Sequence, residues 1–407
     1  MKWIIAVGAR PNFMKAAPIL QAIASHNARS RNGSEQIRAV LVHTGQHYDT
    51  AMSDAFFSDL SLPRPDIFLG VGSGSHAVQT AEIMKQFEEV LLKERPDTVI
   101  VVGDVNSTVA CALVTAKISY NAKGDRPRIV HVEAGLRSFD RSMPEECNRV
   151  VTDHLSDVLF VTEESGLKNL EKEGIPKNRV FFVGNTMIDT LLTFEEKADT
   201  STILKQLGIE ANNNGGGNQG HSKPYVLLTL HRPANVDSPE TFLEILEGLQ
   251  DVATSHRVIF PAHPRTQKQI RQHGFEGYFG SAKPGSAEFN LDDHLGKVTL
   301  LEPQGYLDFL CLMKHARLVV TDSGGIQEET TCLGIPCVTV RENTERPVTI
   351  TAGTNVLGGT LRGSIRDAIR LQMGRTYQKA TPEMWDGKAA QRIVELLTHA
   401  NNSNYPV

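Results

Sequence analysis

The sequence predicts an α/β protein built from two doubly wound domains that face a central cleft. Short runs of Val, Ile and Leu recur along the chain, each followed by Gly or polar residues and then by a helical pattern. Uninterrupted apolar runs are typical of parallel strands that are buried on both faces. Because such runs alternate with helices and fall into two series, we expect one doubly wound sheet in each half.

The apolar runs give the expected strands in chain order. In the first series we expect strands at 3–7, 39–42, 98–102, 128–132, 158–161 and 180–183. In the second series we expect strands at 225–230, 257–260, 297–301, 318–321 and 336–340.

The two series place an N-terminal domain at 1–188 and a C-terminal domain at 189–386. A linker is predicted over 189–223, because this span contains the polar, Gly-rich stretch 212–220, which has no apolar residue. The last helix, within 387–407, could pack back on the first domain.

Composition excludes several classes of protein. The chain has 42 Lys and Arg against 47 Asp and Glu, a net charge of −5, so a general nucleic-acid binder is not expected. No run of 18 apolar residues exists, and the apolar run at 3–7 is too short for a signal peptide, so we expect no membrane insertion. Five cysteines, an odd number without a C-x2-C pair, favour a reducing, cytoplasmic compartment.

The residues after the first strand form a candidate anion site. In doubly wound sheets ligands bind beyond the carboxyl ends of the strands. The first strand leads into Arg10 and Pro11, and Lys15 follows in the first turns of a helix. Two cations beside a helix N-terminus attract an anion. The alternative is a capped helix with solvated charges.

Acidic residues follow the strand at 98–102 and begin a later helix. Asp104 follows the strand, and Glu145 lies at the start of the helical segment Pro-Glu-Glu-Cys-Asn-Arg. Asp104 could instead be an N-cap, and Glu145 could instead pair with Arg149 four residues later.

A third acid lies at the end of the strand at 128–132. Alternation predicts that His131 and Glu133 point to the same side of this strand. A buried acid needs a partner or a function, and Arg137 could be that partner. Three carboxylates at such positions, Asp104, Glu133 and Glu145, favour general acid–base chemistry.

The second half carries a candidate nucleotide site. The segment Thr-Asp-Ser-Gly-Gly runs from the strand at 318–321 into a helix, so Ser323, Gly324 and Gly325 would let backbone N–H groups approach a phosphate. The acid Glu329, further along this helix, could accept hydrogen bonds from ribose. A tight glycine turn is the alternative.

The sequence predicts neither a cofactor nor a metal site. The Gly-rich stretch 70–77 resembles a dinucleotide fingerprint, but no acid ends a strand about 20 residues later, so a nicotinamide cofactor is not expected. The chain has no P-loop, and His43 and His47 lie in a strand-to-loop segment and not on a helix, so we do not expect a metal pair.

Together the motifs resemble the bacterial, non-hydrolysing UDP-N-acetylglucosamine 2-epimerases. The resemblance covers essentially the whole chain through GARPNFMKAAP, HTGQHYD, VVGDVNSTVA, HVEAGLRS, MPEECNRVVTDH, VGNTMID, TLHRPAN, TDSGGIQEE and RENTERP. It implies two Rossmann-like domains of glycosyltransferase-B-like fold, a homodimer, and a UDP-sugar substrate.

The resemblance also implies roles for individual residues. Asp104, Glu133 and Glu145 would be the acid–base set, with His231 as an essential histidine. The diphosphate would lie near Arg10 and Lys15 and on Ser323, Gly324 and Gly325. Glu329 would hold the ribose, Phe309 would pack on uracil, and Arg346 would line the nucleotide cleft.

This sequence departs from the family pattern at a few positions. The usual Arg-Pro-Glu near the start is Arg-Pro-Asn, with Asn12 in the third position. Gln46 and Arg232 resemble parts of a second, activating UDP-N-acetylglucosamine site, but their neighbours differ, for example at His47 and Pro233. The loops at 212–220 and 281–293 are longer than usual.

The implied reaction is reversible inversion at C2, giving UDP-N-acetylmannosamine for surface polysaccharide. The C2 proton has no adjacent carbonyl, so the expected route expels UDP to give a 2-acetamidoglucal and then adds UDP back. Anion-binding helix ends would stabilise the leaving diphosphate. Alternatives are a related UDP-2-acetamido sugar, hydrolysis to free N-acetylmannosamine, a glycosyltransferase of the same fold, or a non-catalytic nucleotide-sugar binder.

Overall fold

A computed structural model describes the chain except for residues 31–35, 46–62, 210–223, 282–290, 380 and 400–407. The chain divides into two compact units. Unit 1 comprises Met1–Thr193 together with Pro382–Val407, and unit 2 comprises Phe194–Thr381. None of the helices in the described ranges has the length and apolar character needed to cross a bilayer.

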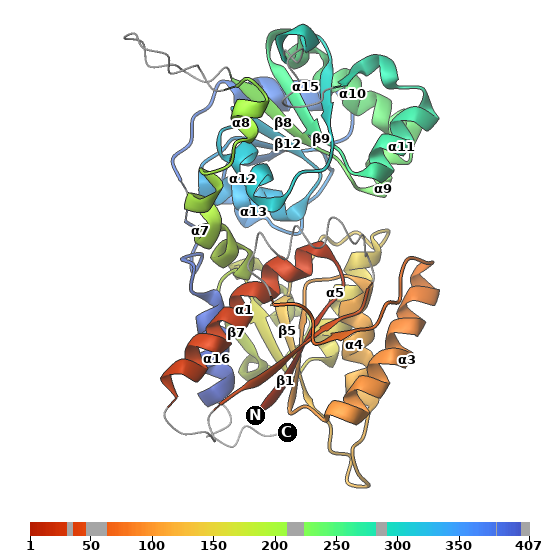
Figure 1. The fold of residues 1–407 in the computed structure, drawn as a ribbon, viewed down its shortest axis with the longest axis vertical. Helices are drawn as coiled ribbons and strands as arrows, with labels where there is room; N and C mark the ends of the chain where they lie inside the picture. Colours follow the sequence, from red (N-terminus) through yellow and green to blue (C-terminus); the bar gives the residue numbers. More distant parts are fainter. Residues whose placement is uncertain (31–35, 46–62, 210–223, 282–290, 380, 400–407) are drawn as a thin grey trace. The chain divides into compact units, whose positions relative to one another are not determined.

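In the described part of unit 1, seven parallel strands form one sheet in the order β3-β2-β1-β4-β5-β6-β7 (Figure 1). The strands are β1 (Lys2–Val7), β2 (Arg38–His43), β3 (Ile67–Phe68), β4 (Thr98–Val102), β5 (Arg128–Ala134), β6 (Val158–Val161) and β7 (Val180–Phe182). Their buried runs of Val and Ile contact helices on both faces, as expected for a parallel sheet.

The helices of unit 1 cover both faces of this sheet. They are α1 (Arg10–Arg29), α3 (His76–Glu94), α4 (Asn106–Lys117), α5 (Pro144–Leu155), α6 (Glu164–Lys172), α7 (Thr186–Ala198) and α16 (Ala389–His399). Helix α4 packs between α3 and α5, whereas α1 packs on α16. Because crossovers are right-handed and the chain leaves β1 and β4 in opposite directions, α1 lies on the face opposite α3, α4 and α5.

Unit 1 is completed by the C-terminal segment. The Asp189 carboxylate of α7 accepts hydrogen bonds from the N–H groups of Ala389 (3.2 Å) and Ala390 (2.7 Å) at the start of α16. The Trp385 indole N–H donates to the Thr162 carbonyl after β6. Helix α7 runs through the first part of the expected linker, because an uninterrupted helical pattern keeps it helical to Ala198.

In the described part of unit 2, a second sheet of seven parallel strands has the order β10-β11-β9-β8-β12-β13-β14. The strands are β8 (Tyr225–Thr229), β9 (Arg257–Pro261), β10 (Phe279–Ser281), β11 (Val298–Leu301), β12 (Leu318–Thr321), β13 (Cys337–Thr339) and β14 (Asn355–Leu357). The helices are α8 (Ile203–Gln206), α9 (Pro233–Val236), α10 (Pro239–Ser255), α11 (Pro264–His273), α12 (Tyr306–Lys314), α13 (Gly324–Leu333), α14 (Val348–Thr351) and α15 (Arg362–Met373).

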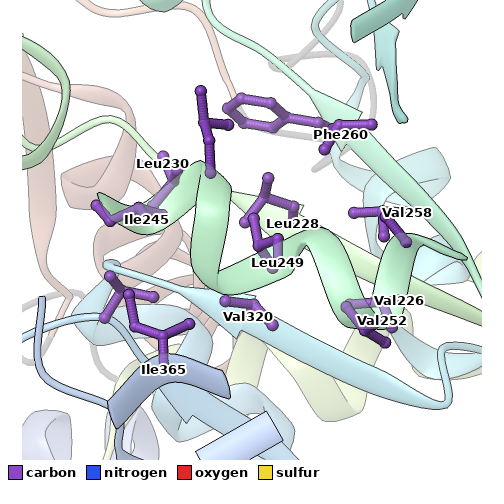
Figure 2. Packing of buried hydrophobic residues seen from close by; sticks show 14 of the residues in the cluster. Val226, Leu228, Leu230, Ile245, Leu249, Val252, Val258, Phe260, Val320 and Ile365 are labelled. Carbon is purple, nitrogen blue, oxygen red and sulfur yellow. The ribbon is translucent and has the colours of Figure 1, made fainter. Parts of the chain in front are cut away.

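One apolar cluster joins the unit 2 sheet to its helices (Figure 2). Val226 and Leu228 of β8 and Val320 of β12 contribute to it from the sheet, and Leu249 of α10 and Ile365 of α15 contribute from the helices. The two helices pack side by side on this face. This core holds the carboxyl ends of β8 and β12 in register, with Thr229 beside Thr321.

The predicted two-domain α/β fold is confirmed, and each expected strand overlaps an observed one. The strands that were missed are β3, β10 and β14, which have only two or three residues. All three lie at sheet edges, with β3 at an edge of the unit 1 sheet and β10 and β14 at the two edges of the unit 2 sheet, where few buried side chains are needed to hold a short strand. Such strands leave no apolar run in the sequence.

His43, at the end of β2, is buried between the rings of Phe13 and Phe68, whose centroids lie 5.0 and 5.2 Å away. Its Nδ1 accepts a hydrogen bond of 2.8 Å from the Gly45 N–H. Burial lowers the pKa of His43 from 6.5 to about 4, against the opposing effect of its backbone hydrogen bond. The folded protein therefore favours the neutral ring.

We predict that His43 makes folding sensitive to mild acid. Because the pKa is lowered in the folded state, its contribution to stability is complete above the unfolded value of 6.5 and is lost as the pH falls towards about 4. Between about pH 7 and about pH 5 this loss is about 2 kcal/mol. Urea unfolding should show a smaller pH dependence for His43→Gln than for the natural protein, and equal dependences would contradict the prediction.

Candidate active site

The polar side chains singled out in the sequence lie at the carboxyl ends of the strands in each unit. In unit 1 they follow β1, β4 and β5 and begin α5, and in unit 2 they follow β8, β12 and β13. Parallel strands carry ligands at this edge.

Asn12 fixes the loop between β1 and α1. Its Oδ1 accepts hydrogen bonds from the N–H groups of Gly8 (3.1 Å) and Ala9 (3.0 Å), and its Nδ2 donates to the Val102 carbonyl (2.9 Å). A carboxylate could accept the first two bonds but has no hydrogen for Val102. The amide of Asn12 therefore fits this loop.

Lys15 and Glu133 form a buried ion pair at the same edge. Lys15 Nζ lies 2.6 Å from Glu133 Oε2, and the two side chains are only 6% and 3% exposed. Gly103, after β4, lies so close that a Cβ there would be 3.0 Å from Lys15 Nζ. The cation predicted to lie near a diphosphate thus contacts one of the three predicted acid–base carboxylates.

The backbone of β5 is distorted at Glu133. This residue has φ 75°, in the left-handed region, and the pairing of β5 with β6 shifts register between Val132 and Ala134. Such a conformation costs a non-glycine residue about 1–3 kcal/mol and is typical of functional sites. The prediction that His131 and Glu133 share one side is wrong, because this bulge turns Glu133 towards α1 while His131 contacts α5.

Asp104 is held by Arg149 of α5. Arg149 Nη1 lies 2.5 Å from Asp104 Oδ2, and Nη2 lies 2.7 Å from Glu146 Oε2. Glu146 also accepts hydrogen bonds from the N–H groups of Ser138 (3.0 Å) and Phe139 (2.9 Å). Burial would raise the pKa of Glu146, but these N–H groups and Arg149 outweigh burial and lower it. Asp104 is therefore an ion-pair partner, not the N-cap of α4, which is Val105.

Glu145 lies in the first turn of α5 and is half-buried. The alternative in which it pairs with Arg149 is wrong, since Arg149 is engaged by Asp104 and Glu146. Within the described chain the Glu145 carboxylate has no hydrogen-bond or ion-pair partner. It is thus the least constrained of the three carboxylates.

Arg137 does not pair with Glu133, contrary to the alternative considered from the sequence. Its Nη2 lies 2.7 Å from Asp153 Oδ2 and 2.7 Å from Glu173 Oε2. Burial opposes the charge of Arg137, but the two carboxylates outweigh it and raise the pKa of the guanidinium.

In unit 2, His231 is oriented by a buried aspartate. Asp322, after β12, is 0% exposed, and its Oδ1 lies 3.0 Å from His231 Nδ1. Asp322 also accepts the N–H groups of His231 and Arg232 and the side-chain N–H of Asn235. Burial would raise the pKa of Asp322, but His231 and these donors lower it. The His231 side chain is 56% exposed, so its ring faces outward from a fixed base.

The N-terminus of α13 lies beside a buried arginine. Ser323 is the N-cap, and its side chain makes no capping hydrogen bond. A Cβ at Gly324 would overlap the Arg346 guanidinium, so this glycine is needed for close approach. Arg346 Nε lies 2.7 Å from Glu328 Oε1, and Nη1 contacts Glu345. Free helix N–H groups and a guanidinium therefore lie together, as an anion site requires.

Three arginines surround Glu345. Arg341 Nη2 lies 2.7 Å from its carboxylate, Arg232 Nη2 lies 3.6 Å away, and Arg346 makes the third contact. Burial would raise the pKa of Glu345, but the three guanidinium groups hold it well below its ordinary value. Burial lowers the pKa of Arg341, and the charges of Arg232 and Arg346 act in the same direction. Arg346 also pairs with Glu328, so the three guanidinium groups lie among buried carboxylates near α13.

The remaining predicted nucleotide contacts lie on α12 and α13. Glu329 is buried and accepts a hydrogen bond of 3.2 Å from the Tyr306 hydroxyl. Phe309, one turn after Tyr306, is half-buried. Arg10 is the first residue of α1, and Gln46 lies outside the described residues. Over the described ranges no group of three or more His, Cys, Asp or Glu side chains is arranged to hold a metal ion.

The sequence prediction missed the side chains that hold the candidate residues in place. They are Glu146, Arg149 and Asp153 in unit 1, and Asp322, Arg341 and Glu345 in unit 2. Asp322 could have been found, because it lies at the end of a buried strand next to Ser323. The partners of Arg149 could not, because both i,i+3 and i,i+4 carboxylates were available to it.

The comparison with known proteins decides the family. A family model described as UDP-N-acetylglucosamine 2-epimerase matches residues 29–398. The chain belongs to the UDP-N-acetylglucosamine 2-epimerase family. The predicted family resemblance is therefore confirmed.

Relatives of this family member align along almost their whole length. The UDP-N-acetylglucosamine 2-epimerase of Methanocaldococcus jannaschii is 39% identical, with 98% of this chain and 99% of that protein aligned. The UDP-2,3-diacetamido-2,3-dideoxy-D-glucuronate 2-epimerase of Pseudomonas aeruginosa is 36% identical, also over 98% and 99%. A crystal structure of the Methanocaldococcus jannaschii protein with UDP-GlcNAc and UDP has a TM-score of 0.82, 38% identity and coverage of 98% and 100%.

We predict that Arg149 is essential for the stability of unit 1. Arg149→Met leaves the buried Glu146 without its counter-ion, which should lower the free energy of unfolding by about 3–5 kcal/mol. Lys168→Met is the matched control, since Lys168 pairs with Glu164 on an exposed helix face and should cost at most about 1 kcal/mol. Urea unfolding measures both, and a similar small loss in each would contradict the prediction.

Proposed function

We propose that this protein interconverts UDP-N-acetylglucosamine and UDP-N-acetylmannosamine by inverting C2, and that unit 1 supplies the acid–base groups while unit 2 binds UDP. The observation that carries the proposal is the gathering of Asp104, Glu133 and Glu145 at one edge of unit 1. Family membership supports it, as does the relative whose crystal structure contains UDP-GlcNAc and UDP.

Unit 1 can serve the acid–base role because its three carboxylates have different environments. Glu133 is buried against Lys15, Asp104 is paired with Arg149 and 22% exposed, and Glu145 is half-buried. Inversion needs a proton removed from one face of C2 and another delivered to the opposite face. Three carboxylates in unlike environments fit this need better than a single titratable group.

Unit 2 can bind the diphosphate through α13 and the arginine cluster. The helix N–H groups after Ser323 and the guanidinium of Arg346 would contact phosphate oxygens. Arg232 lies in the same cluster, so we place its guanidinium near the diphosphate. Phe309 would pack on uracil and Glu329 would bind the ribose.

The atoms and electrons of the proposed steps balance without a cofactor. One carboxylate takes the C2 proton, the C1–O bond breaks, and UDP leaves with the bonding electrons to give a 2-acetamidoglucal. UDP then adds back to C1 while a proton is delivered to C2 on the opposite face. The N–H groups at the start of α13 and the guanidinium of Arg346 would stabilise the departing diphosphate, as preorganised donors do for developing anions.

A related substrate is the second candidate, because the Pseudomonas aeruginosa relative is named for a UDP-2,3-diacetamido-glucuronate. Incubation with each UDP-sugar separately, followed by chromatographic separation of the epimers, decides between them. We expect UDP-N-acetylmannosamine from UDP-N-acetylglucosamine. Release of free N-acetylmannosamine with UDP would contradict the non-hydrolysing reaction. Homodimer formation, cytoplasmic location, supply of surface polysaccharide and activation by a second UDP-N-acetylglucosamine stay predictions.

We predict that each acid–base carboxylate is needed for turnover but not for nucleotide binding. Asp104→Asn, Glu133→Gln and Glu145→Gln should each lower turnover by about 10²-fold or more, the range of general acid–base catalysis. Calorimetric affinity for UDP should remain near that of the natural protein. A variant with near-normal turnover would remove its residue from the set.

We predict that Gly324→Ala weakens UDP binding by displacing Arg346. The added Cβ would overlap the guanidinium, and a lost charged hydrogen bond costs about 1.5–3 kcal/mol, or about 10- to 100-fold in affinity. Gly363→Ala is the matched control, because a Cβ at this helical position meets no atom within 4 Å. Equal calorimetric affinities for UDP in the two variants would show that the nucleotide lies elsewhere.

A further inference from the structure

His131 is a fully buried histidine that none of the proposed roles above uses. It lies on β5, two residues before Glu133, and is 0% exposed. Its Nδ1 lies 2.6 Å from Asp153 Oδ1 of α5, and its Nε2 lies 2.8 Å from the Gly103 carbonyl oxygen after β4. The ring therefore bridges the helix that carries Glu145 and the turn that carries Asp104.

Both partners of the ring accept hydrogen bonds. A carbonyl oxygen can only accept, and the second carboxylate oxygen of Asp153 already accepts the Gly135 N–H at 3.0 Å and lies 2.7 Å from Arg137 Nη2. Asp153 is therefore ionised and also only accepts. Each ring nitrogen of His131 must then carry a hydrogen, which makes the ring an imidazolium.

His43 in the same unit is the opposite case. It is also buried at the end of a strand, but its Nδ1 accepts a hydrogen bond from the Gly45 N–H. A nitrogen that accepts carries no hydrogen, so the His43 ring is neutral. The two buried histidines thus differ in charge because their neighbours differ in hydrogen-bonding role.

Asp153 extends this hydrogen-bond network to the segment that follows Glu133. Its Oδ2 accepts the Gly135 N–H at 3.0 Å, two residues after Glu133, and also contacts Arg137. A Cβ at Gly135, which has φ 81°, would lie 2.6 Å from the Gly166 carbonyl oxygen, so this turn tolerates no side chain. One carboxylate on α5 therefore fixes the chain on the far side of the Glu133 bulge, while His131 fixes the turn before Asp104.

We propose that the His131 imidazolium and Asp153 form a positioning pair that sets Asp104, Glu133 and Glu145 relative to one another. The pair touches none of the three carboxylates and acts through the Gly103 carbonyl, the Gly135 N–H and helix α5. Its effect on turnover rests on the proposed function, but its protonation state does not.

The charged groups around the pair favour the imidazolium form of His131. Asp153 faces His131 from α5, Arg137 faces Asp153 from the loop after β5, and Glu173 faces Arg137. His154 of α5 lies 4.0 Å from Glu173. Two cations, His131 and Arg137, thus share one fully buried carboxylate, with Glu173 balancing the second cation.

Nitrogen NMR of the natural protein tests the protonation state directly. At about pH 8 both His131 ring nitrogens should be protonated, because both face acceptors, whereas His43 should keep one unprotonated nitrogen. Assignment uses His131→Gln and His43→Gln, each of which removes one set of signals. An unprotonated ring nitrogen on His131 at this pH would overturn the proposal, whether or not the protein epimerises any UDP-sugar.

Kinetics test the positioning role. His131→Gln should lower kcat by about 10- to 100-fold, the effect of a small misplacement of reacting groups, with UDP affinity unchanged. His273→Gln is the matched control, since His273 donates to the Val236 carbonyl in unit 2 and should keep kcat within about threefold. A His131→Gln protein with normal kcat and reduced stability would show a structural role only and would overturn the proposal.

Asp153→Asn provides a second variant that keeps the size and the acceptor oxygen but removes the negative charge. The imidazolium then loses its counter-ion. The ratio of the variant's kcat to that of the natural protein should therefore be lowest at high pH and should rise as the pH is lowered. A ratio of the two kcat values that does not depend on pH would contradict a role for the charged ring.

Discussion

The ion pair between Arg149 and Asp104 is the interaction on which the carboxyl edge of the unit 1 sheet depends. Arg149 is almost fully buried on α5, and it joins Asp104 after β4 to Glu146 and, through Glu146, to the loop at Ser138. Removing Arg149 would leave the buried Glu146 carboxylate without its counter-ion. Helix α5 therefore does more than cover the sheet, because it carries Glu145 itself and fixes the strand ends that carry the other two acids.

In unit 2 a buried charged residue, Asp322, likewise joins the ends of separate strands. Asp322 lies in the loop after β12, is completely buried and accepts hydrogen bonds from His231, Arg232 and Asn235. These hydrogen bonds hold the loop after β8 in place. In both units a buried charged group joins the ends of separate strands and leaves an exposed or half-buried group facing outward. Pairing in this way satisfies the buried charge and orders a loop that would otherwise lack apolar contacts.

The sequence predicted the parallel sheets well because burial on both faces forces uninterrupted apolar runs, as at β4 and β12. It also located the candidate acids, because polar residues directly after such runs stand out. It failed at β5, where alternation put His131 and Glu133 on one side, since a bulge with positive φ at Glu133 is not encoded in an apolar pattern. The sequence did not predict the ion-pair partners of Arg149 and Arg137. Tertiary packing selects these partners, and several nearby carboxylates are equally suitable by sequence spacing alone.

We propose that carboxylates of unit 1 remove and replace the C2 proton of a UDP-sugar. Proton NMR of the natural protein with UDP-N-acetylglucosamine in deuterated water tests this most directly. We expect UDP-N-acetylmannosamine to form with deuterium at C2, and the returning UDP-N-acetylglucosamine to carry deuterium there as well. Formation of the epimer with the original hydrogen kept at C2, or loss of UDP without any exchange, would contradict it.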